Sequence, residues 1–299
     1  MLKSLKGGFM KTYNEFCLKV ANLAIMSLLF EVSATPKPGL VDRNNSGAHN
    51  DMNFYTFMSS SSVLFDTFYL CALEGVKFGA SENEKLLKSI RPIGISGEER
   101  MLKMTNGVNT HKGLIFSLGI ISAAAGSIFA EGAEEYISAE QICERVKIIT
   151  KGICKNELAG LAKKDGLTYG EKLYFKYGSK GIRGEVETGF KTVLDYGLPV
   201  IKEYFPNETN TDKVLVQVLL NLVANTEDSN ILGRHDFKTL KYSQRCAKKA
   251  LELGGAYTHK GLKYLKALDK DFIKKHISPG GSADLLAVTV MLYFLEKGW

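Results

Sequence analysis

Helical periodicity is the feature that most constrains this chain. Over most of its 299 residues, apolar side chains recur every three or four positions, which places them on one face of a helix. The alternating pattern of a half-buried strand is nearly absent, and no strand–helix–strand rhythm appears, so a parallel-sheet fold is disfavoured. We therefore expect an all-α fold in which residues 1–299 form a single multi-helix globular domain. The expected helices cover residues 14–30, 53–75, 110–130, 170–177, 185–196, 211–225, 238–253, 260–268 and 283–296.

Two of the helical signals are especially clear. Residues 110–130 are almost wholly small or apolar, which is typical of a helix buried on most sides. Its glycines and alanines would allow neighbouring helices to approach closely. Ser138 and Gln141 have the spacing of a capping box, which predicts that another helix begins there.

The apolar stretches suggest a cytoplasmic protein with no membrane partner. The best candidate for a span, residues 20–30, is far shorter than the ~20 residues that a transmembrane helix needs. The basic N-terminus is followed by Glu31 and a polar motif rather than by the small-residue cleavage site of a signal peptide. The five cysteines form no C-x-x-C pair, so we expect reduced thiols in the core and no zinc site.

The formal net charge of +7 is compatible with nucleic acid or with a small polyanionic ligand. Aromatic residues are not interleaved with the lysines in the manner of a nucleic-acid-binding module. We therefore expect no nucleic-acid partner and read the scattered lysines as a solvated surface.

A dense polar segment, TPKPGLVDRNNSGAHNDM, lies at residues 35–52 between two expected helices. Its prolines and glycines predict a loop of defined shape. A simple connector does not need so many paired charges, so we expect a functional loop. The charged and donor residues of this loop are Lys37, Asp42, Arg43, His49 and Asp51.

The segment GVNTHKG, residues 107–113, leads into the buried helix. Asn109 or Thr110 can cap that helix. His111 and Lys112 then stand at its positive end, where they are unfavourable unless an anion compensates them, so we expect a phosphate there.

The segment GISGEERM, residues 94–101, carries the paired acids Glu98 and Glu99. These acids would open a short helix. Taken alone, they are better explained as first-turn acids that complement the helix dipole than as a site.

A glycine-rich segment, YGSKGIRGEVETGF, covers residues 177–190. Gly181 and Gly184 bracket Arg183, which suits close approach to a ligand, and an arginine can hold a phosphate through two hydrogen bonds. Glu185 and Glu187 point in different directions on a helix, so at most one of them is expected to share a site with Arg183.

Two C-terminal segments complete the set. EDSNILGR, residues 227–234, follows an apolar helix, and SPGGSADLL, residues 278–286, opens the last helix. Gly280 and Gly281 would expose backbone N–H groups to an anion, or they would form an ordinary turn and cap.

None of these segments is a Walker A loop, a nucleophile elbow, an H-E-x-x-H or a dinucleotide-binding fingerprint. Their composition favours a phosphorylated ligand with a divalent cation. Carboxylates and asparagines suit Mg²⁺ that is held partly through water and substrate phosphates.

Together the segments resemble the triphosphoribosyl-dephospho-CoA synthase family, which makes the prosthetic-group precursor for the acyl carrier subunits of citrate lyase and malonate decarboxylase. The resemblance rests on EVSATPKPGLVDRNNSGAHNDM, GVNTHKGLIFSLG, YGSKGIRGEVETGF, EDSNILGR and SPGGSADLLA, which occur in the family's order from Glu31 to Ala287. Two places depart from the family. Arg234 is followed by His235 and Asp236 instead of two glycines, and Tyr169 stands where a histidine is expected.

The resemblance implies that ATP and 3′-dephospho-CoA give 2′-(5″-triphosphoribosyl)-3′-dephospho-CoA and free adenine. A ribose hydroxyl would attack, and the glycosidic bond to adenine would break. Carboxylates would stabilise the oxocarbenium-like charge, one carboxylate would accept the hydroxyl proton, and a donor would protonate adenine. The product would pass to an acyl carrier protein transferase.

The resemblance also implies roles for particular residues around one nucleotide-binding cleft. His111 could donate to a phosphate or protonate adenine. The expected catalytic residues are Asp42, Asp51, Glu98, His111 and Glu185. The expected Mg²⁺ ligands are Asp42, Glu98, Glu185 and Asp228. The expected substrate-binding residues are Lys37, Arg43, Asn109, Lys112, Arg183, Asn230, Arg234, Gly280, Gly281 and Ser282.

Two other functions stay open at this point. One is a nucleotide-binding regulator that has lost turnover, and the other is a different ATP-dependent phosphotransferase or phosphohydrolase on the same scaffold. The sequence does not distinguish the citrate from the malonate system, does not identify the base, and admits a homodimer without requiring one.

Overall fold

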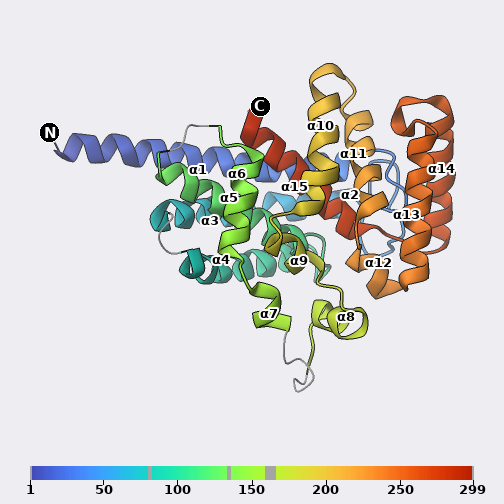
Figure 1. Ribbon diagram of the computed structural model, residues 1–299, viewed down its shortest axis with the longest axis horizontal. Coiled ribbons are helices and arrows are strands. Elements are labelled where there is room, and N and C mark those ends of the chain that lie inside the picture. Colours follow the sequence, from blue (N-terminus) through green and yellow to red (C-terminus); the bar gives the residue numbers. More distant parts are fainter. Residues whose placement is uncertain (1, 80–82, 133–135, 159–165, 298–299) are drawn as a thin grey trace. The chain divides into compact units, whose positions relative to one another are not determined.

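The computed structural model describes residues 2–79, 83–132, 136–158 and 166–297, and all regular secondary structure in these ranges is helical (Figure 1). The all-α prediction is confirmed for this part of the chain. The chain forms two compact units. Unit 1 comprises Met1–Leu28, Met58–Lys151 and Met291–Trp299, and unit 2 comprises Leu29–Phe57 and Gly152–Val290. That residues 1–299 make one domain stays a prediction.

Unit 1 is built around helix α5, which is buried along most of its length. Two glycines allow helix α3 to pack closely against it. A Cβ atom on Gly75 would lie 2.0 Å from the carbonyl oxygen of Ala123, and one on Gly126 would lie 2.1 Å from that of Ala72. The expected close approach of small residues is confirmed. Unit 1 holds most of α1 (Leu2–Ser33) and α2 (Phe54–Ser62), then α3 (Phe65–Phe78), α4 (Asn83–Met104), α5 (Lys112–Ala130), α6 (Ala139–Ile149) and the end of α15 (Gly280–Lys297).

Two expectations for unit 1 are wrong. The helix expected at residues 53–75 is interrupted, because α2 ends at Ser62 and α3 begins at Phe65. The hydroxyl of Ser62 donates to the carbonyl of Ser59 at 2.7 Å, and serines that bond to their own backbone favour helix ends. The acids at residues 98–99 do not open a short helix, since they lie in the second half of α4.

The apolar helices are longer than the sequence suggested. Thr12–Ser33 of α1 and Lys112–Ala130 of α5 are long and apolar enough to cross a membrane by length and composition. The expectation that no stretch reaches that length is therefore wrong. For α5, 78% of the apolar window is buried inside the protein, so its place in a core accounts for its composition.

Unit 2 contains the shortest helices and most of the polar motifs. The expected helices at 170–177, 211–225, 238–253, 260–268 and 283–296 all occur, with small differences at their ends. The elements of unit 2 are α7 (Ile153–Leu158), α8 (Tyr169–Tyr177), α9 (Gly181–Glu187), the π-helix η2 (Val193–Gly197), α10 (Leu198–Tyr204), the 3₁₀ helix η3 (Phe205–Asn207), α11 (Thr211–Asn225), α12 (Ser229–Arg234), α13 (Phe237–Glu252), η4 (Gly255–Tyr257), α14 (His259–Lys274) and the first turns of α15.

The continuous helix expected at 185–196 is wrong. Helix α9 ends at Glu187, and η2 begins only at Val193. Between them, Gly189 and Phe190 have φ angles of +68° and +56°, which lie in the left-handed region and break a right-handed helix.

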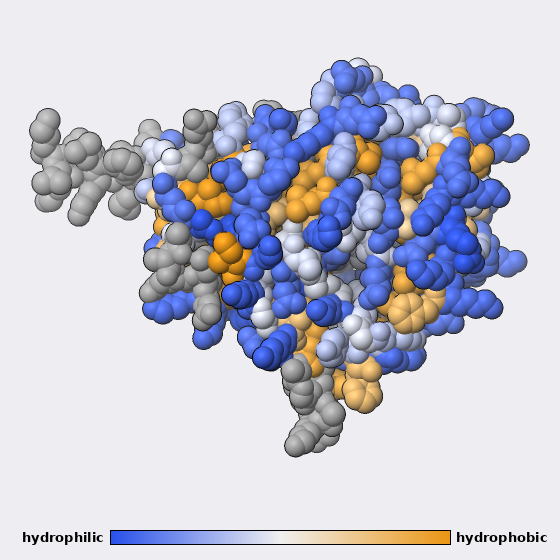
Figure 2. Space-filling model, in the orientation of Figure 1, coloured by the Kyte–Doolittle hydropathy of each residue, from blue (hydrophilic) through white to orange (hydrophobic). Residues whose placement is uncertain are grey.

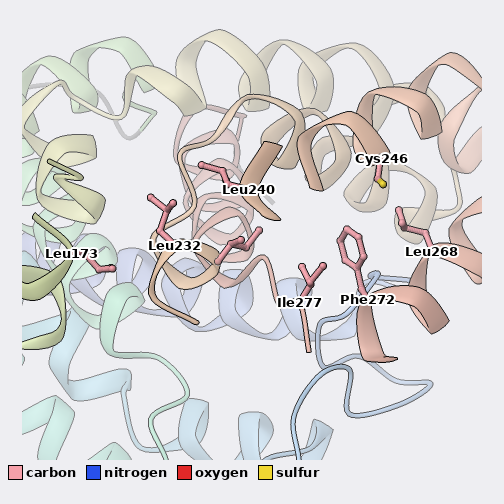
Figure 3. Close-up of a cluster of buried hydrophobic side chains, with 8 residues drawn as sticks. Leu173, Leu232, Leu240, Cys246, Leu268, Phe272 and Ile277 are labelled. Atoms are coloured by element: carbon pink, nitrogen blue, oxygen red, sulfur yellow. The ribbon is translucent and has the colours of Figure 1, made fainter. Parts of the chain in front are cut away.

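A buried apolar cluster holds the short helix α12 in place. Figure 3 shows Leu232 of α12 among side chains from α8, α13 and α14. A six-residue helix is too short to be stable alone, so this packing decides its position and that of the polar residues before it. The cluster consists of Leu173, Ile231, Leu232, Leu240, Cys246, Leu268, Phe272 and Ile277.

The expectation that the cysteines are thiols of the core is confirmed. All five cysteines are free and buried, as reduced core thiols should be. Hydrophilic residues dominate the face shown in Figure 2, with smaller apolar areas between them. The capping box at Ser138 is present, with Gln141 bonded to it in both directions.

Candidate active site

A cavity of about 370 Å³ opens in unit 2, lined by α9, the residues just before α12, and the first turns of α15. Three carboxylates, Glu185, Glu227 and Asp284, and one cation, Lys180, line it. An excess of acceptors suits a ligand that brings hydroxyls, amines or positive charge. The remaining lining residues are Gly178, Gly181, Ile182, Gly184, Thr226, Ser229, Gly281 and Leu285.

Glu185 is the predicted catalytic carboxylate that reaches this cavity. Its Oε1 accepts a hydrogen bond from the hydroxyl of Thr192 at 2.6 Å. Its Oε2 is buried and has no hydrogen-bond partner among the described residues. Burial raises the pKa of Glu185, hydrogen bonds from Thr192 act to lower it, and the nearby Asp195 acts in the same direction as burial. A carboxylate with one free oxygen and a raised pKa is suited to accept a proton.

Asp284 is a cavity residue that sequence reasoning missed. None of the described residues donates a hydrogen bond to its carboxyl or forms an ion pair with it. Burial and the neighbouring carboxyls of Glu31 and Asp228 raise the pKa of Asp284 well above its usual value. The signal was present in the sequence, because Asp284 stands one helical turn after Gly280 and thus on the same side of the helix.

Asp228 does not face the cavity as a free ligand. Its Oδ1 accepts hydrogen bonds from the backbone N–H groups of Asn230 and Ile231, at 3.0 and 3.2 Å. Its Oδ2 accepts from the N–H and the hydroxyl of Ser282, at 2.7 and 2.9 Å. Burial raises the pKa of Asp228, while these donors act to lower it. Both oxygens therefore already serve as helix caps, for α12 and α15.

The same contacts bear on the expected anion site at residues 280–282. The N–H and the hydroxyl of Ser282 are occupied by Asp228, as in the turn-and-cap alternative, and the assignment of Gly280, Gly281 and Ser282 to substrate binding stays a prediction. A Cβ atom on Gly281 would lie 3.1 Å from the Cγ of Asp228, so a larger residue there would require this carboxylate to shift slightly. The side-chain nitrogen of Asn230 packs against Gly280, where a Cβ would lie only 2.7 Å away.

The loop at residues 35–52 is organised by two buried charges. Asp42 accepts hydrogen bonds from the backbone N–H groups of Lys37, Asn44 and Asn45, at 3.0, 2.7 and 3.1 Å. The side chain of Lys37 is 1% exposed and forms an ion pair with Glu31, to whose carbonyl it also donates at 2.6 Å. In this geometry both residues shape the loop, and their assignment to metal and phosphate stays a prediction.

His49 and Asp51 lie at the end of this loop. The Nε2 of His49 is 2.9 Å from the hydroxyl of Ser278, and its Nδ1 is 3.7 Å from Asp51, whose side chain is largely exposed. Burial lowers the pKa of His49, and the charge of Arg234 lowers it further, while Asp51 opposes both. Arg234 therefore lies near the loop.

The three predicted phosphate-binding arginines differ in availability. Arg43 forms an ion pair with Asp212, and Arg183 donates from Nε to Glu157 at 2.7 Å. Arg234 is exposed and forms no ion pair among the described residues. Lys180, which sequence reasoning did not select, lines the cavity 3.7 Å from Glu187.

Four of the predicted site residues, Glu98, Asn109, His111 and Lys112, lie in unit 1. His111 is fully buried, and its Nδ1 lies 2.6 Å from the hydroxyl of Ser60. Lys112 pairs with Glu98 of α4 at 2.7 Å, so a protein carboxylate compensates the start of α5. Asn109 accepts from the N–H of Lys112 at 3.1 Å, as a cap does.

The two departures from the family pattern have local structural roles. His235 ends α12, and its Nε2 lies 2.9 Å from the carbonyl of His276. Asp236 caps α13 by accepting from the N–H of Thr239 at 2.8 Å. The ring of Tyr169 packs on Gly233, where a Cβ would lie 1.7 Å from the hydroxyl oxygen.

Comparison with known proteins identifies the family. The family model described as ATP:dephospho-CoA triphosphoribosyl transferase matches residues 17–299. A Salmonella gallinarum protein named "Probable 2-(5''-triphosphoribosyl)-3'-dephosphocoenzyme-A synthase" is 40% identical over 277 residues, 92% of this chain and 90% of its own.

Two further relatives carry the name 2-(5''-triphosphoribosyl)-3'-dephosphocoenzyme-A synthase. The Klebsiella pneumoniae protein is 39% identical, covering 94% of this chain and 92% of its own, and the Escherichia fergusonii protein is 40% identical, covering 93% and 91%. No solved structure matches the chain. As its motifs predict, the chain belongs to the ATP:dephospho-CoA triphosphoribosyl transferase family.

Proposed function

We propose that this protein transfers the triphosphoribosyl group of ATP to 3′-dephospho-CoA and releases adenine. The product would be the precursor of the acyl carrier prosthetic group of citrate lyase or malonate decarboxylase. Membership of the family supports the reaction class. The observation that carries the proposal for the site is the carboxylate-lined cavity of unit 2, in which Glu185 keeps one oxygen free.

The chemistry of this cavity suits a glycosyl transfer. As the bond between the ribose anomeric carbon and N9 of adenine breaks, its electron pair leaves with adenine and positive charge develops on the ribose. Nearby carboxylates lower the energy of such a transition state. The 2′-hydroxyl oxygen of dephospho-CoA then bonds to the anomeric carbon, its proton passes to a base, and adenine takes up one proton.

Glu185 is the base that the geometry favours. Among the other predicted carboxylates, Asp42 has both oxygens bonded to backbone donors, Glu98 is paired with Lys112, and Asp51 is largely exposed beside His49. Glu185 lines the cavity and its Oε2 accepts no hydrogen bond from the described residues, so this side chain has the capacity to accept the hydroxyl proton.

The triphosphate would be held by cations of unit 2 that form no close ion pair with a carboxylate among the described residues. Lys180 at the cavity and the exposed Arg234 fit this role, because neither is tightly committed to a protein carboxylate. Such charge-assisted contacts hold phosphates well. The loops of unit 2 would then form the nucleotide-binding cleft.

Mg²⁺ fits the donor chemistry of the cavity, although no three His, Cys, Asp or Glu side chains in the described ranges meet as a ready-made site. Mg²⁺ commonly needs only one or two carboxylates together with substrate phosphates. Glu227, an exposed carboxylate at the cavity, would hold it. The ion would supply charge neutralisation on the triphosphate.

The same proposal has consequences for the cellular location and the partners of the protein. The protein would act in the cytoplasm and hand its product to an acyl carrier protein transferase. It would need no nucleic acid and no membrane, and its assembly as a homodimer would be compatible with the reaction.

One assay tests this proposal. The protein is incubated with ATP, Mg²⁺ and 3′-dephospho-CoA, and the products are separated by chromatography. Adenine in equal amount to a triphosphoribosyl product supports the transferase. ADP or phosphate would support a phosphotransferase or hydrolase instead, and ATP binding without any product would support a regulator.

A further inference from the structure

No contact with the described residues accounts for the position of the Asp284 carboxyl. It lines the cavity, has no hydrogen-bond or ion-pair partner among the described residues, and its nearest charged neighbours include the carboxyls of Glu31 and Asp228. A half-buried carboxyl without a partner is unfavourable for a fold. Such a group is expected where a ligand supplies the missing partner.

A second group in the same cavity also lacks a protein partner. Thr226 is 5% exposed, and its hydroxyl oxygen has no hydrogen-bond partner in the described part of the chain. Glu185, Thr226 and Asp284 all line this cavity, and Oε2 of Glu185, like the hydroxyl of Thr226, is buried without a hydrogen-bond partner among the described residues. This combination indicates a bound molecule rather than an accident of packing.

The charge of the cavity decides which part of the substrate fits there. Three carboxylates and one lysine line it, so away from Lys180 a triphosphate would meet mostly like charge. The ribose and adenine of ATP instead bring hydroxyls, an amino group and, during the reaction, positive charge. The ribose–adenine end of ATP is therefore the better match to Asp284 and Thr226.

We propose that Asp284 is a catalytic residue whose carboxylate faces the ribose of ATP and stabilises the positive charge that develops at the anomeric carbon as adenine leaves. This inference rests on the proposed transferase function. The bond that breaks joins this carbon to N9, the bond that forms joins it to the 2′-oxygen of dephospho-CoA, and Glu185 receives the hydroxyl proton. Asp284 itself gains and loses no bond.

The fold holds Asp284 firmly for this task. Asp284 lies in the first turns of α15, and the start of that helix is tied to Asp228 through the N–H and hydroxyl of Ser282. Electrostatic stabilisation is effective when the charge is fixed in advance and does not have to reorganise. Asp228 is thus a positioning residue for Asp284.

The variant Asp284→Asn tests the proposal, because it keeps size and hydrogen-bonding capacity but removes the charge. We expect kcat for adenine release to fall by about 10²- to 10³-fold. The dissociation constant of ATP and the Mg²⁺ concentration for half-maximal rate should change less than about threefold, since the charge acts in the transition state. The melting temperature should stay the same or rise, because a half-buried carboxyl without a partner among the described residues is replaced by a neutral amide.

A matched control is Asp66→Asn on α3, which removes an exposed carboxylate in unit 1 and should leave kcat and melting temperature unchanged. Unchanged kcat in Asp284→Asn overturns the proposal. A higher Mg²⁺ requirement would make Asp284 a metal ligand, and a lowered melting temperature with matching loss of activity would make it structural, so either result also overturns it. If the wild-type protein releases no adenine, the proposed function fails first and the inference falls with it.

Discussion

Asp228 and Ser282 are joined by two hydrogen bonds across 54 residues of sequence, from the N–H and the hydroxyl of Ser282 to one carboxylate oxygen at 2.7 and 2.9 Å. The other oxygen of Asp228 caps α12. One buried carboxylate thereby ties the starts of two helices together. Since α15 carries Asp284, this link also decides where that side chain lies.

Replacement of Asp228 by alanine should lower the free energy of unfolding by about 3 kcal/mol, because several buried donors lose a charged acceptor. Urea denaturation followed by circular dichroism measures this loss. The control is Asp236→Ala, which removes the exposed cap of α13 and should cost about 1 kcal/mol. Equal losses in the two variants would show that Asp228 is an ordinary cap.

The buried ion pair of Lys37 and Glu31 should behave as one unit. Lys37→Met or Glu31→Gln alone should lower the free energy of unfolding by about 3–5 kcal/mol, since each leaves a buried group without its partner. The double variant should lose much less than the sum. The exposed pair Arg43 and Asp212 is the control, and its cycle should give a coupling of about 0.5 kcal/mol. Additive losses at Lys37 and Glu31 would contradict a structural pair and would favour a phosphate contact for Lys37.

Asp42 and Asp51 lie in the same loop, but their replacement should affect stability differently. Asp42 is buried, whereas the side chain of Asp51 is largely exposed. Asp42→Ala removes the acceptor for three backbone N–H groups and should lower the free energy of unfolding by about 2 kcal/mol. Asp51→Ala should change it by less than about 0.5 kcal/mol. Thermal unfolding and adenine release are measured on the same samples. A stable but inactive Asp42→Ala protein would restore the catalytic role that the sequence predicted.

The rate should depend on pH through Glu185. Its pKa is raised, first by burial and then by Asp195, so a base at this position loses activity as the pH falls through a value above that of an ordinary glutamate. Glu185→Gln should lower kcat by about 10²- to 10⁴-fold and abolish this acid limb of the kcat–pH profile. An unchanged acid limb in the variant would assign it to another group.

The same pKa shift has a consequence for stability. A group whose pKa is higher in the folded than in the unfolded state stabilises the fold below its unfolded pKa, and this contribution disappears as the pH rises through the folded pKa. Glu185→Gln should therefore reduce the loss of melting temperature that the wild-type protein shows over that pH window. A variant with the wild-type dependence of melting temperature on pH would refute this.

Replacement of Arg234 or Lys180 should weaken the binding of ATP. Arg234→Gln and Lys180→Gln should each raise the KM for ATP about tenfold, which equals 1.4 kcal/mol of binding free energy, with a smaller change in kcat. Lys176→Gln, an exposed lysine over the ring of Tyr177, serves as the control and should leave the KM unchanged. Steady-state kinetics at two salt concentrations would show whether the lost contacts are electrostatic.

The sequence by itself determined the features that depend on neighbours along the chain. The helical class, the helices at 170–177 and 211–225, the capping box at Ser138 and the family motifs are all recognisable from local patterns, since helix periodicity and caps involve residues within a few positions of one another. Local patterns failed at 53–75 and 185–196. In the first a cluster of serines ends a helix, and in the second two left-handed residues break one.

Only the tertiary structure decided which charges are free. The sequence alone does not rank four charged residues as ligand-binding groups: Lys37, Asp42, Asp228 and Glu185. In the folded protein, Lys37 forms an ion pair with Glu31, and Asp42 and Asp228 accept hydrogen bonds from protein donors. Glu185 has one oxygen without a hydrogen-bond partner among the described residues. The physical reason is that a polar residue's role depends on the partner it meets across space. That partner was far away in the sequence for Asp228 and, among the described residues, absent for Asp284.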